Sequence, residues 1–252
     1  MLRTYVAGPE TATPPLLIVH GLYGSARNWN GMAKRLSDTR KVITVDQRNH
    51  GESPWFQSHS YPDMATDLAE VIAAHGGVAD VVGHSMGGKA AMTLALTQPD
   101  MVNRLVVADI APVAYTHDQL QFIHAMRALD VETADTRSAA NAQLAARIDD
   151  AGIRAFLLQS FDRKEKKWVL NLDVLEREMP NVVGWPEISG SFDAATLFLS
   201  GGASDYVLPE HRTKIRGLFP KARFAKIPGA GHWLHAEKPD AFEASLRAFL
   251  PV

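Results

Sequence analysis

The chain contains no cysteine among its 252 residues. This absence excludes disulfide bonds, thiolate zinc sites and a cysteine nucleophile, and it fits a reducing compartment. No apolar run reaches the roughly 20 residues that a membrane-spanning helix needs. The first six residues also lack the long apolar core of a signal peptide. We therefore expect a cytoplasmic protein without a membrane span.

The sequence also lacks a surplus of either positive or negative residues. Lys and Arg number 26 against 28 Asp and Glu, which gives a formal net charge of −2. With 46% hydrophobic and 21% charged residues, the composition is that of an ordinary globular domain with a sizeable core. Because no basic excess is present, the sequence gives no electrostatic reason to expect nucleic acid or an anionic membrane as a partner. The expected partner is a small molecule, and the oligomeric state stays open.

Strand-type and helix-type segments alternate along much of the chain. Runs typical of buried strands lie at residues 16–20, 41–46, 79–82, 104–109, 196–200 and 223–227. Helical patterns separate most of these runs. This alternation predicts an α/β fold with a mostly parallel central sheet and helices on both faces.

The pattern changes between residues 112 and 190, where no strong strand is visible. Helices are expected there over residues 120–129, 137–148, 153–160 and 170–179. A helical block inside an alternating pattern indicates an inserted cap at the end of a strand, where open α/β sheets place their sites. We therefore divide the chain into an α/β core of residues 1–111 and 191–252 and a helical cap of residues 112–190.

The most informative motif is Gly83-His84-Ser85-Met86-Gly87. It reads G-x-S-x-G and lies between a strand-type run and the helix-forming run of residues 89–96. A serine on such a tight turn adopts a strained backbone, and the flanking glycines allow the chain to pass closely. The helix N-terminus behind it offers free N–H groups to a developing oxyanion. The motif therefore predicts Ser85 as a nucleophile.

Two other interpretations of this motif exist. Gly83 to Lys89 also spells G-x-x-x-x-G-K, the front of a phosphate-binding loop, but Ala90 stands where that motif needs Ser or Thr to hold magnesium. The second alternative is a glycine-rich turn with a buried serine and no chemistry. No H-E-x-x-H or H-x-H-x-D cluster is present, and we expect no metal and no cofactor.

A serine hydroxyl needs a base that is held by an acid. His232 follows the last predicted strand in the loop Gly229-Ala230-Gly231-His232, and an order of serine, acid and histidine is expected of this architecture. Asp109 and Asp205 each follow a predicted strand whose end can face His232. The residues alone leave the choice of acid open, and either aspartate can instead cap a helix or close a turn. His235 is expected to pack or bond locally.

Two backbone N–H groups are expected to form an oxyanion hole. One belongs to Met86, directly after the serine, and the other to Leu22, in the small-residue loop of residues 20–25. His20 is expected to organise that loop. The polar turn of residues 46–54 carries a carboxylate, a guanidinium and an imidazole, which we expect to bond to one another and brace the neighbouring loop.

Together these stretches resemble the α/β-hydrolase superfamily over nearly the whole chain. Within it, the chain is similar to the small bacterial esterases of the YbfF type and to the abhydrolase-domain-11 proteins. The matching stretches are residues 20–25 with Asn28-Trp29, 46–54, 83–89, 109–112, Trp168 with Asn171-Leu172, and 231–236. The R-N-H-G-x-S-P and D-I-A-P stretches together are much more specific than G-x-S-x-G.

The resemblance implies an ester or thioester hydrolase with a Ser-His-Asp triad and a helical cap. It favours Asp109 as the triad acid over the alternative Asp205, because relatives of this type often lack a carboxylate at the position that matches Asp205. Apolar residues of the expected cap are candidates to line an acyl pocket or to pack between helices: Phe122, Met126, Phe156 and Trp185.

We therefore expect a serine hydrolase that cleaves carboxylic esters or thioesters of small to medium acyl chains through an acyl-enzyme. One alternative is another reaction on the same fold, namely C–C bond hydrolysis, perhydrolysis or lactone opening. The other is a non-catalytic ligand receptor. Dehalogenation and epoxide hydrolysis are disfavoured, because both use a carboxylate nucleophile where this chain has Ser85.

Overall fold

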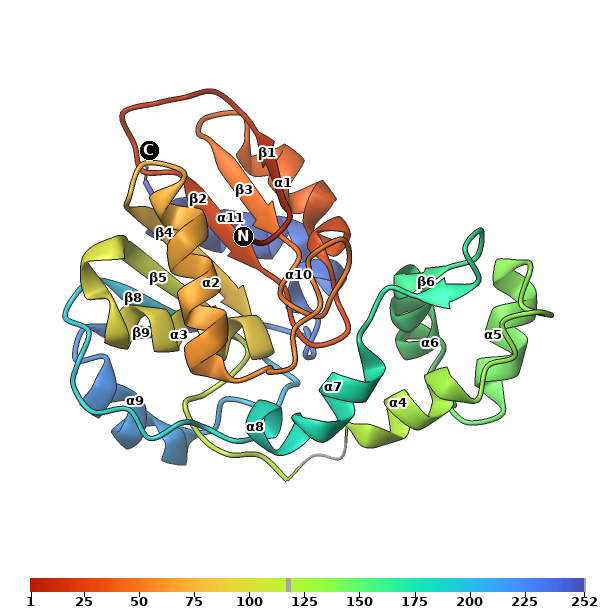
Figure 1. The fold of residues 1–252 in the computed structure, drawn as a ribbon. Helices are drawn as coiled ribbons and strands as arrows, with labels where there is room; N and C mark the ends of the chain where they lie inside the picture. The colour runs from red at the N-terminus through yellow and green to blue at the C-terminus, as the bar shows by residue number, and fades with distance from the viewer. Residues whose placement is uncertain (117–118, 252) are drawn as a thin grey trace.

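The computed structural model describes residues 1–116 and 119–251. Within these residues the main sheet has seven strands in the order β1-β3-β2-β4-β5-β8-β9 (Figure 1). β1 pairs antiparallel with β3, and the other neighbours are parallel. The strands are β1 Thr4–Ala7, β2 Leu16–Val19, β3 Val42–Val45, β4 Ala79–His84, β5 Val102–Ala108, β8 Thr196–Gly201 and β9 Ala222–Ile227. The predicted mostly parallel α/β fold is confirmed.

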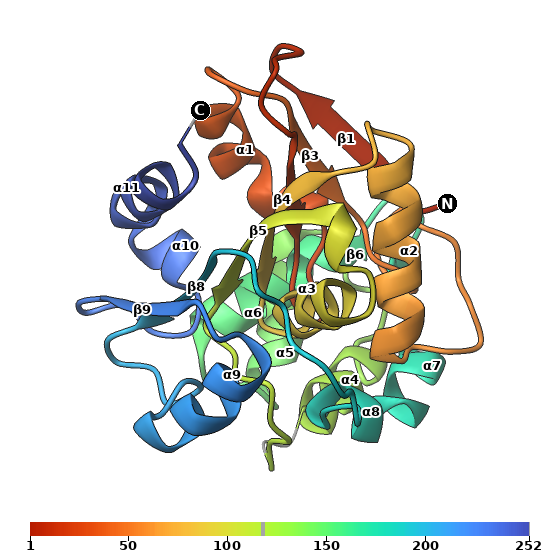
Figure 2. The ribbon, with the colours of Figure 1, turned by 90° about the vertical axis from the view of Figure 1, so that its left-hand side faces the viewer.

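Helices cover both faces of this sheet (Figure 2). α2, α3 and α9 pack on one face, and α1, α10 and α11 pack on the other. They span α1 Asn30–Leu36, α2 Tyr61–Ala73, α3 Met86–Thr97, α9 Arg212–Leu218, α10 Leu234–Glu237 and α11 Pro239–Phe249. Short 3-10 turns are η1 Ala26–Trp29, η2 Pro99–Met101, η3 Leu158–Ser160 and η4 Pro209–His211.

The two faces arise from the alternation of side chains along each buried strand. In β2, Leu17 and Val19 join the cluster beneath α2 and α3, whereas Leu16 and Ile18 join the cluster beneath α1 and α11. All four residues are buried, which is why the strand reads as a continuous apolar run.

The local sequence of α2 explains where that helix begins and which side it buries. The Ser60 side chain accepts a hydrogen bond from the N–H of Asp63, one of the N–H groups that the first turn leaves free. Met64, Leu68 and Ile72 follow at helical spacing, and all three are buried. α2 is therefore one of the helical patterns that separate the predicted strand runs.

Most of the described residues between 112 and 190 lie to the right of the sheet in Figure 1. Their helices are α4 Leu120–Arg127, α5 Arg137–Ala145, α6 Ala151–Leu157, α7 Leu172–Arg177 and α8 Met179–Val183. No strong strand is predicted in this segment, and the two strands that the structure describes there, β6 Phe161–Asp162 and β7 Lys167–Trp168, form a small antiparallel hairpin. Strands of two residues are too short to give a periodic signal.

β1, the antiparallel edge strand, is not predicted from the sequence. Its residues are half-buried or exposed, so no buried apolar run marks it. Its pairing with β3 joins Thr4 to Val45 and Ala7 to Val42. The sheet is therefore one strand wider than the alternating pattern predicts.

A buried ion pair stands at the beginning of β4. Arg40 Nη2 lies 2.8 Å from Asp80 Oδ2, and the two side chains are only 3% and 0% exposed. Asn103 donates a further hydrogen bond to Asp80 Oδ1 at 2.7 Å. A carboxylate without water needs such partners, since burial removes its hydration.

We expect Arg40→Leu to lower the free energy of unfolding by about 3 kcal/mol, because it removes the nearer cationic partner of the buried Asp80 carboxylate, whose other partner Arg104 lies at 3.9 Å. Urea denaturation followed by circular dichroism would measure the change. Arg35→Leu is the matched control, since Arg35 pairs with Asp240 and Glu243 at the surface, where ion pairs contribute little. Equal losses of unfolding free energy in the two variants would show that the buried pair stabilises the fold no more than the surface pairs do.

Candidate active site

Ser85 lies on the turn between β4 and α3, with φ of 53° and ψ of −122°. This backbone conformation is strained for a residue with a side chain. Glycines make room for it: a Cβ on Gly83 would lie 2.3 Å from the Gly87 carbonyl oxygen, and one on Gly87 would lie 2.4 Å from that of His20. The tight turn that the motif predicts is therefore present.

The imidazole of His232 lies between Ser85 and Asp109. His232 Nε2 is 3.1 Å from Ser85 Oγ, and His232 Nδ1 is 2.7 Å from Asp109 Oδ2. The ring of Tyr206 stacks on the imidazole with centroids 4.0 Å apart. Three residues that follow β4, β5 and β9 thus form one continuous line of hydrogen bonds.

The Asp109 carboxylate is fully buried and accepts several hydrogen bonds. Oδ1 accepts from the N–H of Gly201 at 3.0 Å, while Oδ2 accepts from the Ser204 hydroxyl in addition to bonding with His232. Asp109 also has a positive φ of 53°. These contacts fix the carboxylate and, through it, the orientation of the imidazole.

Asp205, the alternative acid, is exposed on the loop after β8. In the described part of the chain, no hydrogen bond or ion pair joins its carboxylate to His232. Its neighbours contact the site instead, since Ser204 donates to Asp109 and Tyr206 stacks on His232. Neither Ser204 nor Tyr206 is predicted as a site residue from the sequence. The only indication of such a role is their place in the loop that follows a strand.

Leu22 and Met86 line the same pocket as Ser85. Among residues 1–116 and 119–251, the N–H groups of Leu22 and Met86 have no hydrogen-bond partner. Gly21 lets the Leu22 loop approach closely, because a Cβ on Gly21 would lie 3.2 Å from the Cβ of Ser85. Two free N–H groups therefore border the serine.

Buried histidines hold the loop that carries Leu22. His20 Nε2 accepts from the N–H of Gln47 at 2.9 Å, and His50 Nε2 accepts from the N–H of Tyr23 at 3.2 Å. Burial lowers the pKa of His20 to about 4 and that of His50 to about 3. Both rings are therefore neutral near pH 7 and can accept these hydrogen bonds. His20 organises its loop as predicted.

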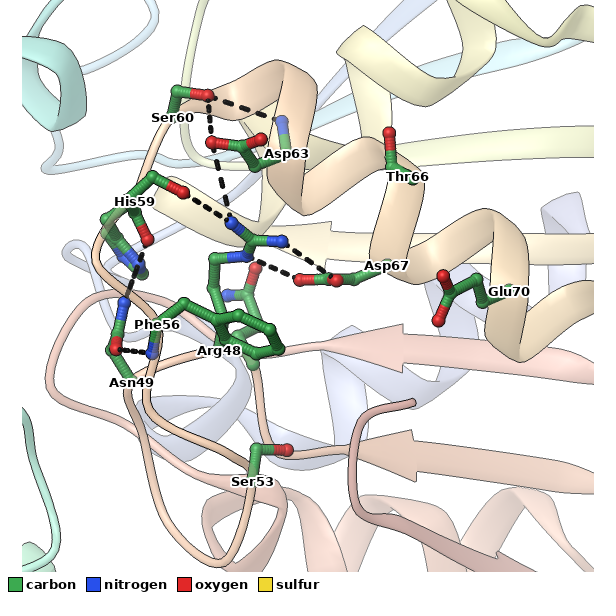
Figure 3. A network of polar contacts seen from close by, with 12 residues as sticks. Arg48, Asn49, Ser53, Phe56, His59, Ser60, Asp63, Thr66, Asp67 and Glu70 are labelled. Atoms are coloured by element: carbon green, nitrogen blue, oxygen red, sulfur yellow. Dashed lines mark hydrogen bonds and ion pairs between the residues drawn. The ribbon is translucent and has the colours of Figure 1, made fainter.

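The side chains of Asp46, Arg48 and His50 do not bond to one another as expected, although His50 Nδ1 donates to the Arg48 carbonyl oxygen at 2.9 Å. Arg48 points toward α2, where it binds both oxygens of Asp67 at 2.6 and 2.9 Å (Figure 3). Asp46 accepts instead from two backbone N–H groups at 2.7 and 2.9 Å. The turn spreads the three side chains in different directions, so each braces a different neighbour.

The same turn is joined to the helical segment of residues 112–190. The N–H of Asn171 donates to the Asn49 carbonyl at 3.0 Å, and the Asn171 side-chain amide donates to Asn49 Oδ1 at 3.1 Å. The N–H of Gly51 donates to the Val169 carbonyl at 2.8 Å. The R-N-H-G stretch therefore links the two parts of the molecule.

A pocket of about 230 Å³ opens at Ser85. The helical segment and its ends contribute these lining residues: Tyr115, Gln119, Phe122, Ile153, Phe156, Leu157, Val182 and Val183. Of the four apolar candidates, Phe122 and Phe156 line the pocket. Met126 is buried in the core cluster, and Trp185 is not among the lining residues.

Lys89, on which the phosphate-loop alternative depends, binds protein carbonyls. Its Nζ donates to the carbonyl oxygens of Val183, at 3.0 Å, and Gly184. The arrangement gives no support to a phosphate cradle. Within the described residues, no group of three or more His, Asp or Glu side chains is placed to hold a metal ion. No described helix is long and apolar enough to cross a membrane.

The sequence profile described as the alpha/beta hydrolase family matches residues 16–245. The chain belongs to this family. The sn-1-specific diacylglycerol lipase ABHD11 of Mus musculus is 42% identical and covers 96% of this chain and 82% of its own length. Esterase YbfF of Escherichia coli K12 is 40% identical and covers 99% of this chain and 98% of its own length.

A solved structure, described as a marine microorganism esterase, shares the fold of this alpha/beta hydrolase with a TM-score of 0.93. It is 39% identical in sequence, and the match covers 99% of each chain. The resemblance to YbfF-type esterases and abhydrolase-domain-11 proteins is therefore confirmed over nearly the full length.

His235, near the site, makes the stability of the fold depend on pH. Its ring stacks on Trp29 with centroids 4.1 Å apart, which fits the predicted local packing. Burial lowers the pKa of His235 from 6.5 to about 3. Between pH values of about 3 and 6.5, the unfolded chain binds a proton at His235 that the folded chain does not. The free energy of unfolding therefore falls as the pH drops.

We expect His235→Phe to reduce this acid sensitivity, because a phenyl ring can stack on Trp29 without binding a proton. Urea denaturation at about pH 7, 6 and 5 would give the slope of unfolding free energy against pH. The slope should not vanish, since His20 and His50 contribute with the same sign.

His124→Phe is the control for this experiment, because His124 is 62% exposed. It should leave the slope close to that of the wild type. A slope that His235→Phe does not change would contradict the low pKa of His235 in the folded chain.

Proposed function

We propose that this chain is a serine hydrolase that cleaves carboxylic esters, or thioesters, of small to medium acyl chains through an acyl-enzyme. Its relatives identify it as an ester-hydrolysing enzyme. The proposal adds the residues that perform the reaction and the region that selects the acyl group. One observation carries it: Ser85, His232 and Asp109 are joined by contacts of 3.1 and 2.7 Å beside a pocket lined largely by apolar and aromatic residues.

In the proposed first step, His232 Nε2 takes the proton from Ser85 Oγ as the hydroxyl attacks the acyl carbonyl carbon. Asp109 orients the imidazole and stabilises the imidazolium that forms. The N–H groups of Leu22 and Met86 donate to the oxyanion, so they stabilise the charge where it develops.

Collapse of the tetrahedral intermediate breaks the bond to the leaving group. His232 gives its proton to the departing alcohol or thiol, and the acyl group stays on Ser85. Water then attacks this acyl-enzyme while His232 takes its proton. A second collapse releases the carboxylic acid and restores the serine hydroxyl. The sequence of steps uses protein groups and water alone.

We assign residues 112–190 as a cap that shapes the acyl pocket and residues 1–111 and 191–252 as the core that performs the reaction. The support is the origin of the lining side chains. Phe122, Ile153 and Phe156 come from α4 and α6, whereas Ser85 and His232 come from the core. A small-molecule ester with an apolar acyl group fits such a lining.

The serine assignment is tested with p-nitrophenyl esters from acetate to dodecanoate. We expect steady hydrolysis by the wild type and a loss of at least about 10³-fold in kcat for Ser85→Ala, because the nucleophile is removed. Ser245→Ala is the control, since Ser245 lies half-buried on α11 and does not line the pocket. Hydrolysis that survives Ser85→Ala would refute the proposed function.

The choice of acid is tested with matched amides. Asp109→Asn should lower kcat by about 10⁴-fold, because an amide supports the wrong tautomer of the catalytic histidine. Asp205→Asn should change kcat by no more than a few-fold. Initial rates on one good ester compare the two variants, and the opposite ranking would assign the acid role to Asp205.

A further inference from the structure

The carboxyl end of α8 is held by a lysine from the core. The last carbonyl groups of any helix have no partner within that helix. Here the Lys89 ammonium donates to the carbonyls of Val183, at 3.0 Å, and Gly184. A cation at this end also interacts favourably with the helix dipole.

Two tyrosines complete the attachment of α8. The Tyr61 hydroxyl donates to the Val182 carbonyl, and the N–H of Tyr115 donates to the Val183 carbonyl at 2.9 Å. Tyr61 belongs to α2, and Tyr115 follows β5. The end of α8 is thus held by α2 and α3 of the core and by the segment that follows β5, and Lys89 supplies the only charged donor among these three residues.

Lys89 is an unusual residue to find buried, because its side chain carries a charge. It is 1% exposed, and its Nζ lies over the rings of Tyr115 and Tyr61 at 4.8 and 5.6 Å from their centroids. Among the described residues, no carboxylate lies within ion-pair distance of it. A buried ammonium without a counter-ion is costly, so the carbonyl contacts explain its presence. The serine mechanism does not use it.

The tied end of α8 is also a wall of the pocket. Lys89, Val182 and Val183 all belong to the lining that surrounds Ser85. Lys89 lies on α3, four residues after the serine. The contact therefore fixes the distance between this wall and the hydroxyl that attacks the substrate.

We propose that Lys89 is a positioning residue that ties α8 to α3 and thereby limits the length of the acyl chain that the pocket accepts. This inference rests on the proposed function, because the acyl chain is the group that the wall confines. Without the tie, the wall can yield to longer chains.

The strength of the contacts by which Lys89 ties α8 to α3 depends on the charge of Lys89. Burial and, to a smaller extent, the positive charge of Lys214 lower the pKa of Lys89 to about 7. Charge-assisted hydrogen bonds to the carbonyls are therefore present below about pH 7 and weaken above it. The rings of Tyr61 on α2 and Tyr115 after β5 contact the Lys89 ammonium, Lys214 on α9 acts on it through its charge, and α8 presents carbonyls. Burial raises the pKa of both tyrosines, so neither ionises near pH 7.

The test compares wild type with Lys89→Met, which removes the donors and keeps most of the side-chain length. The measured quantity is the ratio of kcat/KM for p-nitrophenyl decanoate to kcat/KM for the acetate. Titrations that affect all esters alike cancel in this ratio. We expect the wild-type ratio to rise as the pH passes about 7, and the Lys89→Met ratio to be at least about tenfold higher at low pH and independent of pH.

A second readout separates the tie from a simple change in polarity. Hydrogen exchange of peptides that cover residues 179–184, followed by mass spectrometry, reports local opening of α8. Lys89→Met should speed this exchange by about tenfold and leave exchange in α5 unchanged. A raised ester ratio without faster exchange would overturn the proposal, because polarity alone would then explain the preference.

Tyr61→Phe keeps the proposal testable if Lys89→Met does not fold. It removes the hydroxyl that donates to the Val182 carbonyl and changes no charge. It should raise the ratio by a smaller factor than Lys89→Met does. Lys214→Met is the control, since Lys214 is exposed. It should leave the ratio at low pH unchanged and move the rise to higher pH, because a repelling charge is gone.

The outcomes distinguish this inference from the proposed function. A wild-type ratio that is independent of pH, with ratio and exchange unchanged in Lys89→Met, would overturn the tie and leave the serine mechanism intact. Hydrolysis that persists in Ser85→Ala would instead overturn the mechanism itself.

Discussion

The close approach of strand ends at one edge of the parallel sheet is the constraint on which the rest of this structure depends. A Cβ on Gly201 would lie 2.2 Å from the Gly231 carbonyl oxygen, so no other residue fits there without a shift. Parallel strands bring their carboxyl ends to the same edge. Ser85, Asp109 and His232 therefore meet although up to 147 positions separate them in the chain.

The sheet and the meeting of Ser85 with His232 could be predicted, because buried strands are continuous apolar runs and strand ends share an edge. The partner of His232 could not be predicted from the residues alone. The loops of Asp109 and Asp205 both reach that edge, and only the direction of each side chain separates them. Asp109 points inward from a backbone with φ of 53°, whereas Asp205 is exposed.

Short elements and long side chains escaped prediction for different reasons. β1 is half-exposed, and β6 and β7 have two residues each, so none of them produces a periodic pattern. The long side chain of Arg48 can reach several carboxylates, and its partner Asp67 lies on α2. No spacing rule along the chain selects that pair, because it depends on how α2 packs.

The junction between Asn49 and Asn171 bears on how such an enzyme can change over evolution. It fastens the helical segment to a core turn through backbone and amide groups at 3.0 and 3.1 Å. Helices that take no part in these two hydrogen bonds, such as α6, carry pocket residues including Ile153 and Phe156. Substitutions there would change the pocket lining and leave the neighbours of Ser85 in place. Substrate preference can therefore diverge among descendants without the loss of the reaction.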